Sequence, residues 1–472
     1  MGMRFIDRQP ELGRLEAFVD RQEGGLAVIW GRRRIGKTRL LLEWCEAHGG
    51  AYAVADQSSP EIQRRHLAVA LAEALPGFSD AEYPTWDALF ARLAREAANA
   101  SWTGPLILDE FPYLVASSSE LPSVFQRWLD HAAKKARLRV AIAGSSQRMM
   151  QGLVLDANAP LYGRAVEAFQ LSPLAAGFVG DALGIRDALE CVKAYAVWGG
   201  VPRYWEITQP FGTDLDAALD ACVLDPHGPL HTEPERLLLE ELPPALSLRP
   251  ILDAIGMGAH RVSEIAGRIG QPATALTRPL ARLREMGLVA REAPFGSSEK
   301  SGKRALYRIA DPFLRMWFRV VAPQRGILAR ASRKVRAELW RRERERLFAE
   351  SWEDLCRRAI PAIAESDPRL GRGSAWLPAA RYWHGGGPEW DAVTSTVDGS
   401  RLLVGEAKWS EQPVADIESI AARLAAKGAP PVAGTGDTEV FRCVLVPRVA
   451  SGTRRPRSVV VKDARSVLNA LR

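Results

Sequence analysis

The stretch GGLAVIWGRRRIGKTRLLLEW, residues 24–44, decides the fold of the first part of the chain. Residues 26–30 are apolar and predict a buried strand, while residues 38–45 have the apolar spacing of a helix. Between them stands the pattern Gly31-x4-Gly36-Lys37-Thr38. Glycines let backbone N–H groups surround phosphates, a lysine at this position reaches the β- and γ-phosphates, and the threonine hydroxyl binds Mg²⁺. The pattern therefore predicts a loop for ATP with Mg²⁺, in preference to a strand–turn–helix with chance glycines.

A second motif, GPLILDEFPYL (104–114), supplies acidic partners for this loop. Its short apolar run 106–108 predicts a buried parallel strand that ends at Asp109 and Glu110. We expect Asp109 to help hold Mg²⁺ and Glu110 to orient and polarise the attacking water. The alternative is an acidic helix cap after a strand, which the neighbouring phosphate loop makes the weaker interpretation.

Two further features point to the same site. A third apolar strand, within LRVAIAGSSQRMM (138–150), ends in Ser145 and Ser146, whose hydroxyls we expect between the first two motifs, where they could sense the γ-phosphate. Arg164, in APLYGR (159–164), is a candidate for stabilising phosphate charge, either in its own chain or across an oligomer interface. An ordinary surface salt bridge explains Arg164 equally well.

Six segments, in order, resemble the archaeal-type ATPase family, which belongs to the AAA+/signal-transduction ATPase assemblage. They are FIDRQPELGRL (5–15), WGRRRIGKT (30–38), LILDEF (106–111), AGSSQRMM (143–150), PLYGR (160–164) and WGGVPRYW (198–205). The resemblance spans residues 4–245 and implies that Arg8 and Glu11 flank the nucleotide. It also implies that the turn 200–202 couples nucleotide state to a helical domain. Arg34 in the loop and Arg39 just after it are assigned to the same nucleotide site.

The middle of the chain predicts a winged helix. Helices are expected over 251–255, 262–269 and 273–286, followed by strands at 288–292 and 304–309 around a wing at 295–304. On the third helix, Arg278, Arg282 and Arg284 lie away from the apolar face and could contact DNA phosphates. A protein-interaction module remains the alternative, since Pro279 disturbs the helix that would enter the groove. The basic stretch 325–347 is expected to be helical, as a solvated face or as a phosphate-binding surface.

Residues 389–410, EWDAVTSTVDGSRLLVGEAKWS, predict a hairpin around Asp398-Gly399. A two-residue loop sets the register, which places Asp391 opposite Glu406 and Glu389 opposite Lys408. Because like charges facing each other on a sheet repel, a divalent cation between Asp391 and Glu406 would stabilise the pair. Lys408 would then orient a metal-bound water or stabilise phosphorane charge. A ladder of ion pairs on a solvated face is the alternative.

This Asp…Glu-x-Lys arrangement resembles the PD-(D/E)xK nuclease superfamily, and in particular the nuclease-like domain that follows the winged helix in the same ATPase family. The resemblance covers residues 345–450 and implies that Glu353, in SWEDLCRR (351–358), is a further metal ligand. Trp390 stands where the superfamily has proline. Degenerate members keep this fold and lose turnover, so catalysis does not follow from the motif alone.

The whole sequence of 472 residues predicts a multidomain α/β protein. We expect a P-loop ATPase core with magnesium (1–170), a helical lid (171–245), a winged helix-turn-helix (246–322) and a nuclease-like α/β domain with a basic helical lead-in (323–472).

The 63 basic and 56 acidic residues allow a DNA partner without requiring one. Five dispersed cysteines argue against a disulfide framework, and no apolar run reaches the ~18 residues of a membrane span, so a cytoplasmic protein is expected. The expected function is an ATP-driven switch that acts on or grips DNA, as a monomer or homo-oligomer; the alternative is a signalling ATPase whose last domain binds a partner without cutting.

Overall fold

In this computed structural model the chain forms two compact units, which are described separately. The first comprises Asp7–Leu174 and Val201–Arg203, and the second comprises Met1–Ile6, Ala175–Gly200 and Tyr204–Arg472. The structure describes residues 3–145, 147–157, 159–241, 248–298, 304–370, 373–432 and 438–472. Ser146 and the central part of the expected wing, residues 299–303, lie outside these ranges.

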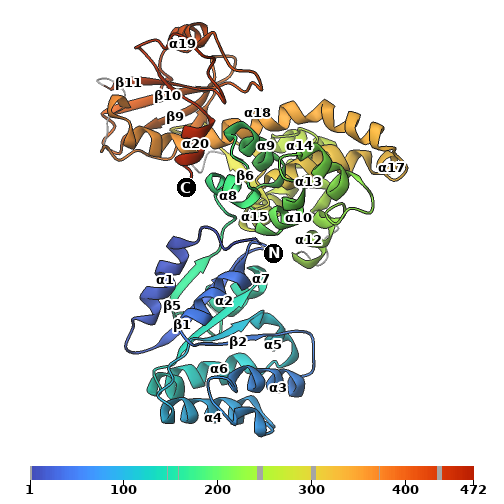
Figure 1. Ribbon diagram of the computed structural model, residues 1–472, viewed down its shortest axis with the longest axis vertical. Coiled ribbons are helices and arrows are strands. Elements are labelled where there is room, and N and C mark those ends of the chain that lie inside the picture. Colours follow the sequence, from blue (N-terminus) through green and yellow to red (C-terminus); the bar gives the residue numbers. More distant parts are fainter. Residues whose placement is uncertain are drawn as a thin grey trace. The chain divides into compact units, whose positions relative to one another are not determined.

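The first unit is built on a five-stranded sheet in the order β2-β3-β4-β1-β5, in which all neighbouring strands are parallel (Figure 1). The strands are β1 (Gly25–Trp30), β2 (Ala51–Val54), β3 (Leu106–Asp109), β4 (Arg139–Gly144) and β5 (Ala165–Gln170). β4 lies between β1 and β3, so the segment after β4 emerges between the phosphate loop and the acidic motif. The predicted position of this third strand between the two motifs is confirmed.

Helices flank this sheet and complete its core. They are α1 (Gln9–Val19), α2 (Lys37–Ala47), α3 (Pro60–Leu71), α4 (Trp86–Asn99), α5 (Phe111–Ser117), α6 (Leu121–Trp128) and α7 (Gln147–Met150). The aromatic rings of Trp86, Phe90 and Trp128 stack inside one apolar cluster together with strand residues such as Leu106 and Ile142. This buried layer fixes the strand ends that carry the polar motifs.

The second unit begins with a helical region, as the periodicity of residues 171–245 predicts. Its helices are α8 (Val179–Leu183), α9 (Ala188–Trp198), α10 (Pro202–Thr208), α11 (Leu215–Leu219) and α12 (Glu233–Glu241). Helix α10 starts within the three residues that belong to the first unit.

The next elements follow the predicted helix–helix–helix–strand–strand order. They are α13 (Arg249–Gly256), α14 (Val262–Ile269), a 3₁₀ turn (Ala273–Leu276), α15 (Thr277–Glu285), β6 (Val289–Glu292) and the antiparallel β7 (Leu306–Ile309). The predicted third helix is irregular at its start, because residues 273–276 form a 3₁₀ turn and α15 starts at Thr277 with Pro279 in its first turn. A proline in the first turn of a helix loses no internal hydrogen bond. Leu280 and Leu283 are buried as predicted, while Arg278 and Arg284 are exposed.

One long helix, α18 (Arg333–Ser366), joins these elements to the C-terminal sheet within the second unit (Figure 1). It follows α16 (Pro312–Met316) and α17 (Arg325–Leu328). The expectation of a single helix over 325–347 is therefore corrected, since α17 and α18 are separate. With 34 residues, α18 is about 51 Å long.

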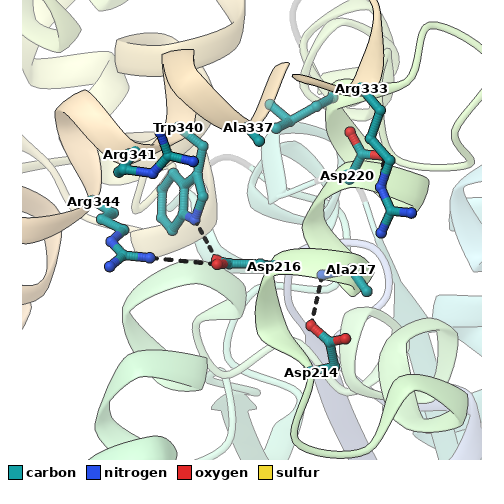
Figure 2. A pocket seen from close by; sticks show the side chains of 10 residues that line it. Asp214, Asp216, Ala217, Asp220, Arg333, Ala337, Trp340, Arg341 and Arg344 are labelled. Atoms are coloured by element: carbon teal, nitrogen blue, oxygen red, sulfur yellow. Dashed lines mark hydrogen bonds and ion pairs between the residues drawn. The ribbon is translucent and has the colours of Figure 1, made fainter. Parts of the chain in front are cut away.

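Three arginines in the basic half of α18, namely Arg333, Arg336 and Arg344, pair with acidic side chains of the helical region. Arg336 contacts Asp220 through Nε (2.6 Å) and Asp225 through Nη1 (3.2 Å). Figure 2 shows Arg344 and the indole of Trp340 both directed at Asp216, beside a cavity of about 130 Å³. The acidic partners of these arginines are residues 216, 220 and 225, which lie outside the basic stretch 325–347.

The C-terminal region is a mixed sheet in the order β12-β11-β10-β9-β8. Its elements are β8 (Ala380–Tyr382), β9 (Trp390–Ser395), β10 (Arg401–Ala407), α19 (Ile417–Ala426), β11 (Glu439–Leu445), β12 (Val460–Lys462) and α20 (Ala464–Asn469). β10 pairs with β9 in antiparallel fashion, with Leu402 opposite Ser395 and Gly405 opposite Ala392, so the predicted register is confirmed. The loop is longer than predicted: Val397 donates its N–H to Ala375 and not across the hairpin, and the last cross-strand bond joins Thr396 to Arg401.

Candidate nucleotide and divalent-cation sites

The phosphate loop connects the end of β1 to the first turn of α2. Gly36 caps this helix with a φ of 92°, and Gly31 has no room for a side chain, because a Cβ there would lie 2.6 Å from the carbonyl oxygen of Leu171. Lys37 is only 5% exposed, and its Nζ donates to the carbonyl oxygens of Gly31 (2.7 Å) and Arg32 (3.2 Å). The ammonium group is thus folded over the loop that would surround the phosphates.

The structure brings Thr38 and Asp109 together, as the two motifs predict. Thr38 Oγ1 donates to Asp109 Oδ2 at 2.9 Å, and the carboxylate is held from its other side by the backbone N–H of Glu110. Tyr52, on the edge strand β2, donates its hydroxyl to the same Oδ2 at 2.7 Å. Burial, together with the adjacent Asp109, raises the pKa of Tyr52, so the phenol remains a donor. Asp109 is 1% exposed and is oriented by three neighbours.

Glu110 stands at the end of β3 with a φ of 52°, a left-handed conformation that is uncommon outside glycine. Its Oε2 accepts from the Ser145 hydroxyl (2.9 Å) and backbone N–H (3.2 Å). Ser145 is therefore in contact with the candidate water-orienting carboxylate, at the position predicted for a γ-phosphate sensor. The second expected hydroxyl, that of Ser146, lies outside the described residues.

The buried side chain of Arg8 contacts the backbone of the phosphate loop. Its side chain is 4% exposed, donates through Nη2 to the carbonyl oxygen of Ile35 at 2.7 Å, and pairs with Glu11 at 3.0 Å. Arg8 and Glu11 are the two residues that the family resemblance places beside the nucleotide. Arg8 contacts the loop backbone, and Glu11 pairs with Arg8. Pro202 packs against the loop as well, since a Cβ at Gly36 would lie 3.6 Å from its Cγ.

Arg164 does not act at the phosphate loop of its own chain. It precedes β5, whose first residue Ala165 pairs with Leu26 at the start of β1, whereas the phosphate loop follows the other end of β1. The length of the strand, roughly 15 Å, separates the two. Arg164 instead forms a two-point ion pair with Asp130, with Nε and Nη2 each 3.0 Å from a carboxylate oxygen. The surface salt bridge is the correct interpretation within one chain.

The two other arginines assigned to the nucleotide have different surroundings. Arg39 is 61% exposed on α2 and pairs with Glu43 one turn along the helix. Arg34 has a φ of 69°, so the loop backbone is strained at this residue. Their contacts with a nucleotide remain predictions.

At the C-terminal site, Glu406 ends the buried face of β10. Leu402 and Val404 precede it on the same face and pack into an apolar cluster that includes Leu424 of α19. Glu406 is 6% exposed, which rules out the ladder on a solvated face. Glu389, expected to face Lys408, pairs with Arg381 instead.

Two lysines bind the Glu406 carboxylate. Lys408 Nζ lies 2.8 Å from Oε1, and Lys427 Nζ lies 2.6 Å from Oε2. Burial alone would raise the pKa of Glu406, but the hydrogen bonds from the two lysines outweigh it and the pKa is lowered. Glu406 is therefore ionised at neutral pH.

Asp391 and Glu353 complete the site. Asp391 Oδ2 accepts from the backbone N–H of Ala407 at 2.9 Å, which ties the start of β9 to the end of β10. Burial, and next the charge of Glu406, raises the pKa of Asp391. Burial, and next the charge of Asp391, raises the pKa of Glu353 on α18 to about 7. Buried carboxylates that repel one another fit a divalent cation, which removes the repulsion.

Sequence reasoning missed three residues: Tyr52, Lys427 and Arg357. The last donates to the carbonyl oxygen of Asp391 at 3.1 Å and lies 3.7 Å from Glu353. Within the described ranges, no group of three or more His, Cys, Asp or Glu side chains is arranged to hold a metal ion. A magnesium site needs only one or two carboxylates when water and phosphate complete the shell, so the donor set of Asp391 with Glu406 or Glu353 is sufficient.

Comparisons with known proteins agree with the geometry of the first site. Residues 5–206 match the family described as an ATPase domain predominantly from Archaea. The match covers the phosphate loop, the acidic motif and the Pro202 turn. Residues 317–420 match a family of archaeal and bacterial proteins of unknown function, which includes α18 and the candidate carboxylates.

One curated protein matches almost the whole chain, and two solved structures match about two thirds of it. The chain is 27% identical over 448 residues to the uncharacterized protein MJECL04 of Methanocaldococcus jannaschii, covering 95% of this chain and 96% of the relative. The Walker-type ATPase paby2304 of Pyrococcus abyssi is similar in fold, with a TM-score of 0.52 and 20% identity over 67% of this chain and 96% of that one. The ORC2 protein of Aeropyrum pernix, solved with ADPNP and ADP, gives a TM-score of 0.46 and 15% identity over 70% of this chain and 95% of its own.

In the part of the chain that the structure describes, every helix is too short or too polar to cross a bilayer.

Proposed function

We propose that this protein is an ATP-hydrolysing switch whose C-terminal domain is a magnesium-dependent, nuclease-like module that acts on or grips DNA. The observation that carries the first part is the 2.9 Å contact between Thr38 and Asp109 at the ends of neighbouring motifs. These two residues would hold Mg²⁺, which neutralises charge on the β- and γ-phosphates when bound. Lys37 would exchange its carbonyl partners for phosphate oxygens, and Glu110, held by Ser145, would orient the attacking water.

Coupling to the second unit follows from the path of the chain. The three residues Val201–Arg203 belong to the first unit, whereas the segments on either side of them belong to the second unit. Pro202 packs against Gly36, so a change in the phosphate loop between nucleotide states reaches the start of α10 directly. ATP shifts the switch only as far as it binds one of the two arrangements more tightly.

At the C-terminal site, Asp391, Glu406 and Glu353 would hold a divalent cation, which stabilises charge on a phosphodiester when bound. Lys408 would release Glu406 and donate to a phosphate oxygen. Arg357 fixes the backbone of Asp391, and Lys427 fixes Glu406 through the second carboxylate oxygen. The three carboxylates, the adjacent lysine and the burial of Glu406 support the nuclease-like assignment.

A second function has its own supporting observation. Both oxygens of Glu406 are already bonded to ammonium groups, so the charge of this carboxylate is offset without a cation. A domain that has lost turnover and binds DNA or a protein partner would retain such an arrangement. The protein would then be a signalling ATPase.

The decisive experiment measures cleavage of plasmid and single-stranded DNA with Mg²⁺ or Mn²⁺, with and without ATP. We expect Glu406→Gln to abolish metal-dependent cutting and Lys37→Ala to remove its dependence on ATP. Glu389→Gln is the matched control for the first variant, because Glu389 lies nearby but pairs with Arg381. Lys134→Ala is the control for the second, as an exposed lysine of the same unit. Absence of cutting by wild-type protein that binds ATP would favour the signalling function.

Arg164 keeps one proposed role, at the nucleotide of a second copy of the chain. In that case Arg164→Ala would lower ATP turnover only at concentrations where the wild type self-associates. Equal turnover by the wild type and the variant across the whole concentration range would exclude the role.

A further inference from the structure

A cavity of about 260 Å³ lies inside the second unit, among β6, β7, α16 and the middle of α18. Four arginines line it: Arg308, Arg315, Arg357 and Arg358. Only two carboxylates do so, those of Glu292 and Asp354. The lining of this cavity therefore carries two more positive than negative charges.

Asp354 holds the arginines in place. It receives Arg315 Nη2 at 2.8 Å and also pairs with Arg308 and Arg357. Burial works against its charge, but the three arginines outweigh burial and keep the pKa of Asp354 far below its usual range. Glu292 also pairs with Arg308 and Arg357, yet the two carboxylates leave part of the hydrogen-bonding capacity of the arginines unused.

The unused capacity is buried. Arg315 Nη1, Arg308 Nε, Ser351 Oγ and Glu292 Oε2 have no hydrogen-bond partner, although Arg315 is 6% exposed and Ser351 is 2% exposed. Of the thirteen such atoms among the described residues, four belong to residues that line this one cavity. A buried polar group without a partner destabilises the folded state, so the concentration of such atoms indicates that something else bonds to them.

We propose that this cavity binds the phosphate group of a small molecule, either inorganic phosphate or a nucleoside 5′-monophosphate. Its oxygens accept from Arg315 Nη1, Arg308 Nε and Ser351 Oγ, and its two charges offset the excess of the lining. A proton on the phosphate or a hydroxyl of the ligand donates to Glu292 Oε2. Arginine is the side chain best suited to phosphate, and 260 Å³ far exceeds the roughly 10–15 Å³ that one water requires.

This site is separate from the carboxylates of the C-terminal site but adjoins them. Arg357 lines the cavity and donates to the backbone of Asp391. The proposal does not depend on nuclease activity, because it rests on the cavity and its unpaired atoms alone.

The test is equilibrium binding to the full-length Lys37→Ala protein, in which the phosphate loop is disabled. The probes are inorganic phosphate, 5′-AMP and adenosine. We expect one saturable site per chain for phosphate, for 5′-AMP or for both, and no binding of adenosine. Tighter binding of 5′-AMP identifies a nucleotide as the ligand, and equal or tighter binding of inorganic phosphate identifies the free ion.

Two variants test the location. Ser351→Ala removes one small hydroxyl and Arg315→Lys keeps the charge, and each is expected to weaken binding about tenfold, as loss of one charge-assisted hydrogen bond does. Arg346→Ala is the control, since Arg346 is an exposed arginine of the same helix that pairs with Glu350. If Arg315→Lys fails to fold, Ser351→Ala still decides the matter. No saturable binding, or binding that both folded variants retain unchanged, would overturn the proposal and leave a cavity that holds water.

Discussion

Arg8 is the residue that links the segment before β1 to the phosphate loop. Its guanidinium is buried and makes a charged hydrogen bond to the Ile35 carbonyl, a kind of bond worth about 1.5–3 kcal/mol. We predict that Arg8→Ala weakens ATP binding about tenfold or more, because the loop loses its support. Titration with a fluorescent ATP analogue measures the change.

The matched control for Arg8 is Arg14→Ala. Arg14 lies on α1, the helix that Arg8 caps, but is 51% exposed and pairs with Glu167. It should bind ATP as the wild type does. Equal losses in both variants would mean that the segment matters only for general stability.

The raised pKa of Glu353 makes the stability of the second unit depend on pH. Its pKa is about 7 in the folded chain against 4.5 for the free side chain, so the folded state holds a proton that the unfolded state has released between these values. Stability from this group is fully present below pH 4.5 and is lost as the pH rises through 7. We predict that Glu353→Gln becomes more stable relative to wild type from pH 5 to pH 8, by the order of 2 kcal/mol.

Chemical denaturation at several pH values, without divalent cations, measures this difference. Glu365→Gln is a suitable control, because Glu365 is an exposed carboxylate of the same helix. A constant difference between the Glu353 variant and wild type would contradict the raised pKa.

At the scale of elements, some arginines in the basic half of α18 hold this helix to the helical region through ion pairs. Arg336 is 12% exposed and reaches Asp220 and Asp225, whereas Arg341 is 60% exposed and pairs with Glu338 on its own helix. We predict that Arg336→Ala lowers the free energy of unfolding by about 1–3 kcal/mol, and Arg341→Ala by less than about 0.5 kcal/mol. Thermal or urea unfolding compares the two variants.

Measurement of DNA affinity tests the alternative role of this helix, which is contact with phosphates. If the helix served mainly to contact phosphates, Arg341→Ala would reduce affinity and its salt dependence while Arg336→Ala left stability unchanged. That outcome would contradict the structural role of the ion pairs.

Local patterns in the sequence were sufficient for most elements. The strand before the phosphate loop, the acidic motif, the hairpin register and the buried face that ends at Glu406 were all predictable, because each depends on residues close together in the chain. The partners of Arg336 and Glu406 were not, since Asp220 and Lys427 approach only after long-range folding. Whether Arg164 forms a salt bridge or contacts phosphate stayed open in the sequence, because the partner Asp130 and the direction of β5 relative to β1 cannot be read from the motif. Tyr52 carried no signal at all.

At the scale of the whole molecule, the division into two units predicts where ATP stabilises the chain. A ligand that binds only the folded state adds about 2.7 kcal/mol at 100 times its dissociation constant. We predict that ATP with Mg²⁺ raises the unfolding temperature of the ATPase unit and leaves any separate transition of the second unit nearly unchanged. Lys37→Ala should remove the shift.

Differential scanning calorimetry with and without ATP makes this measurement, and limited proteolysis identifies which unit each transition represents. Lys134→Ala should behave like wild type. An equal shift of both transitions in the Lys37 variant would place ATP binding outside the phosphate loop.

Helix α18 has a consequence for how the second unit can be divided. Its first half packs on α11, and its second half carries Glu353 beside β9 and donates Trp352 Nε1 to the backbone of β11. Within residues 333–366, a cut in the chain would expose a face of α18 that is buried against the helical region or the C-terminal sheet. Shortened proteins that begin within residues 333–366 are therefore expected to aggregate.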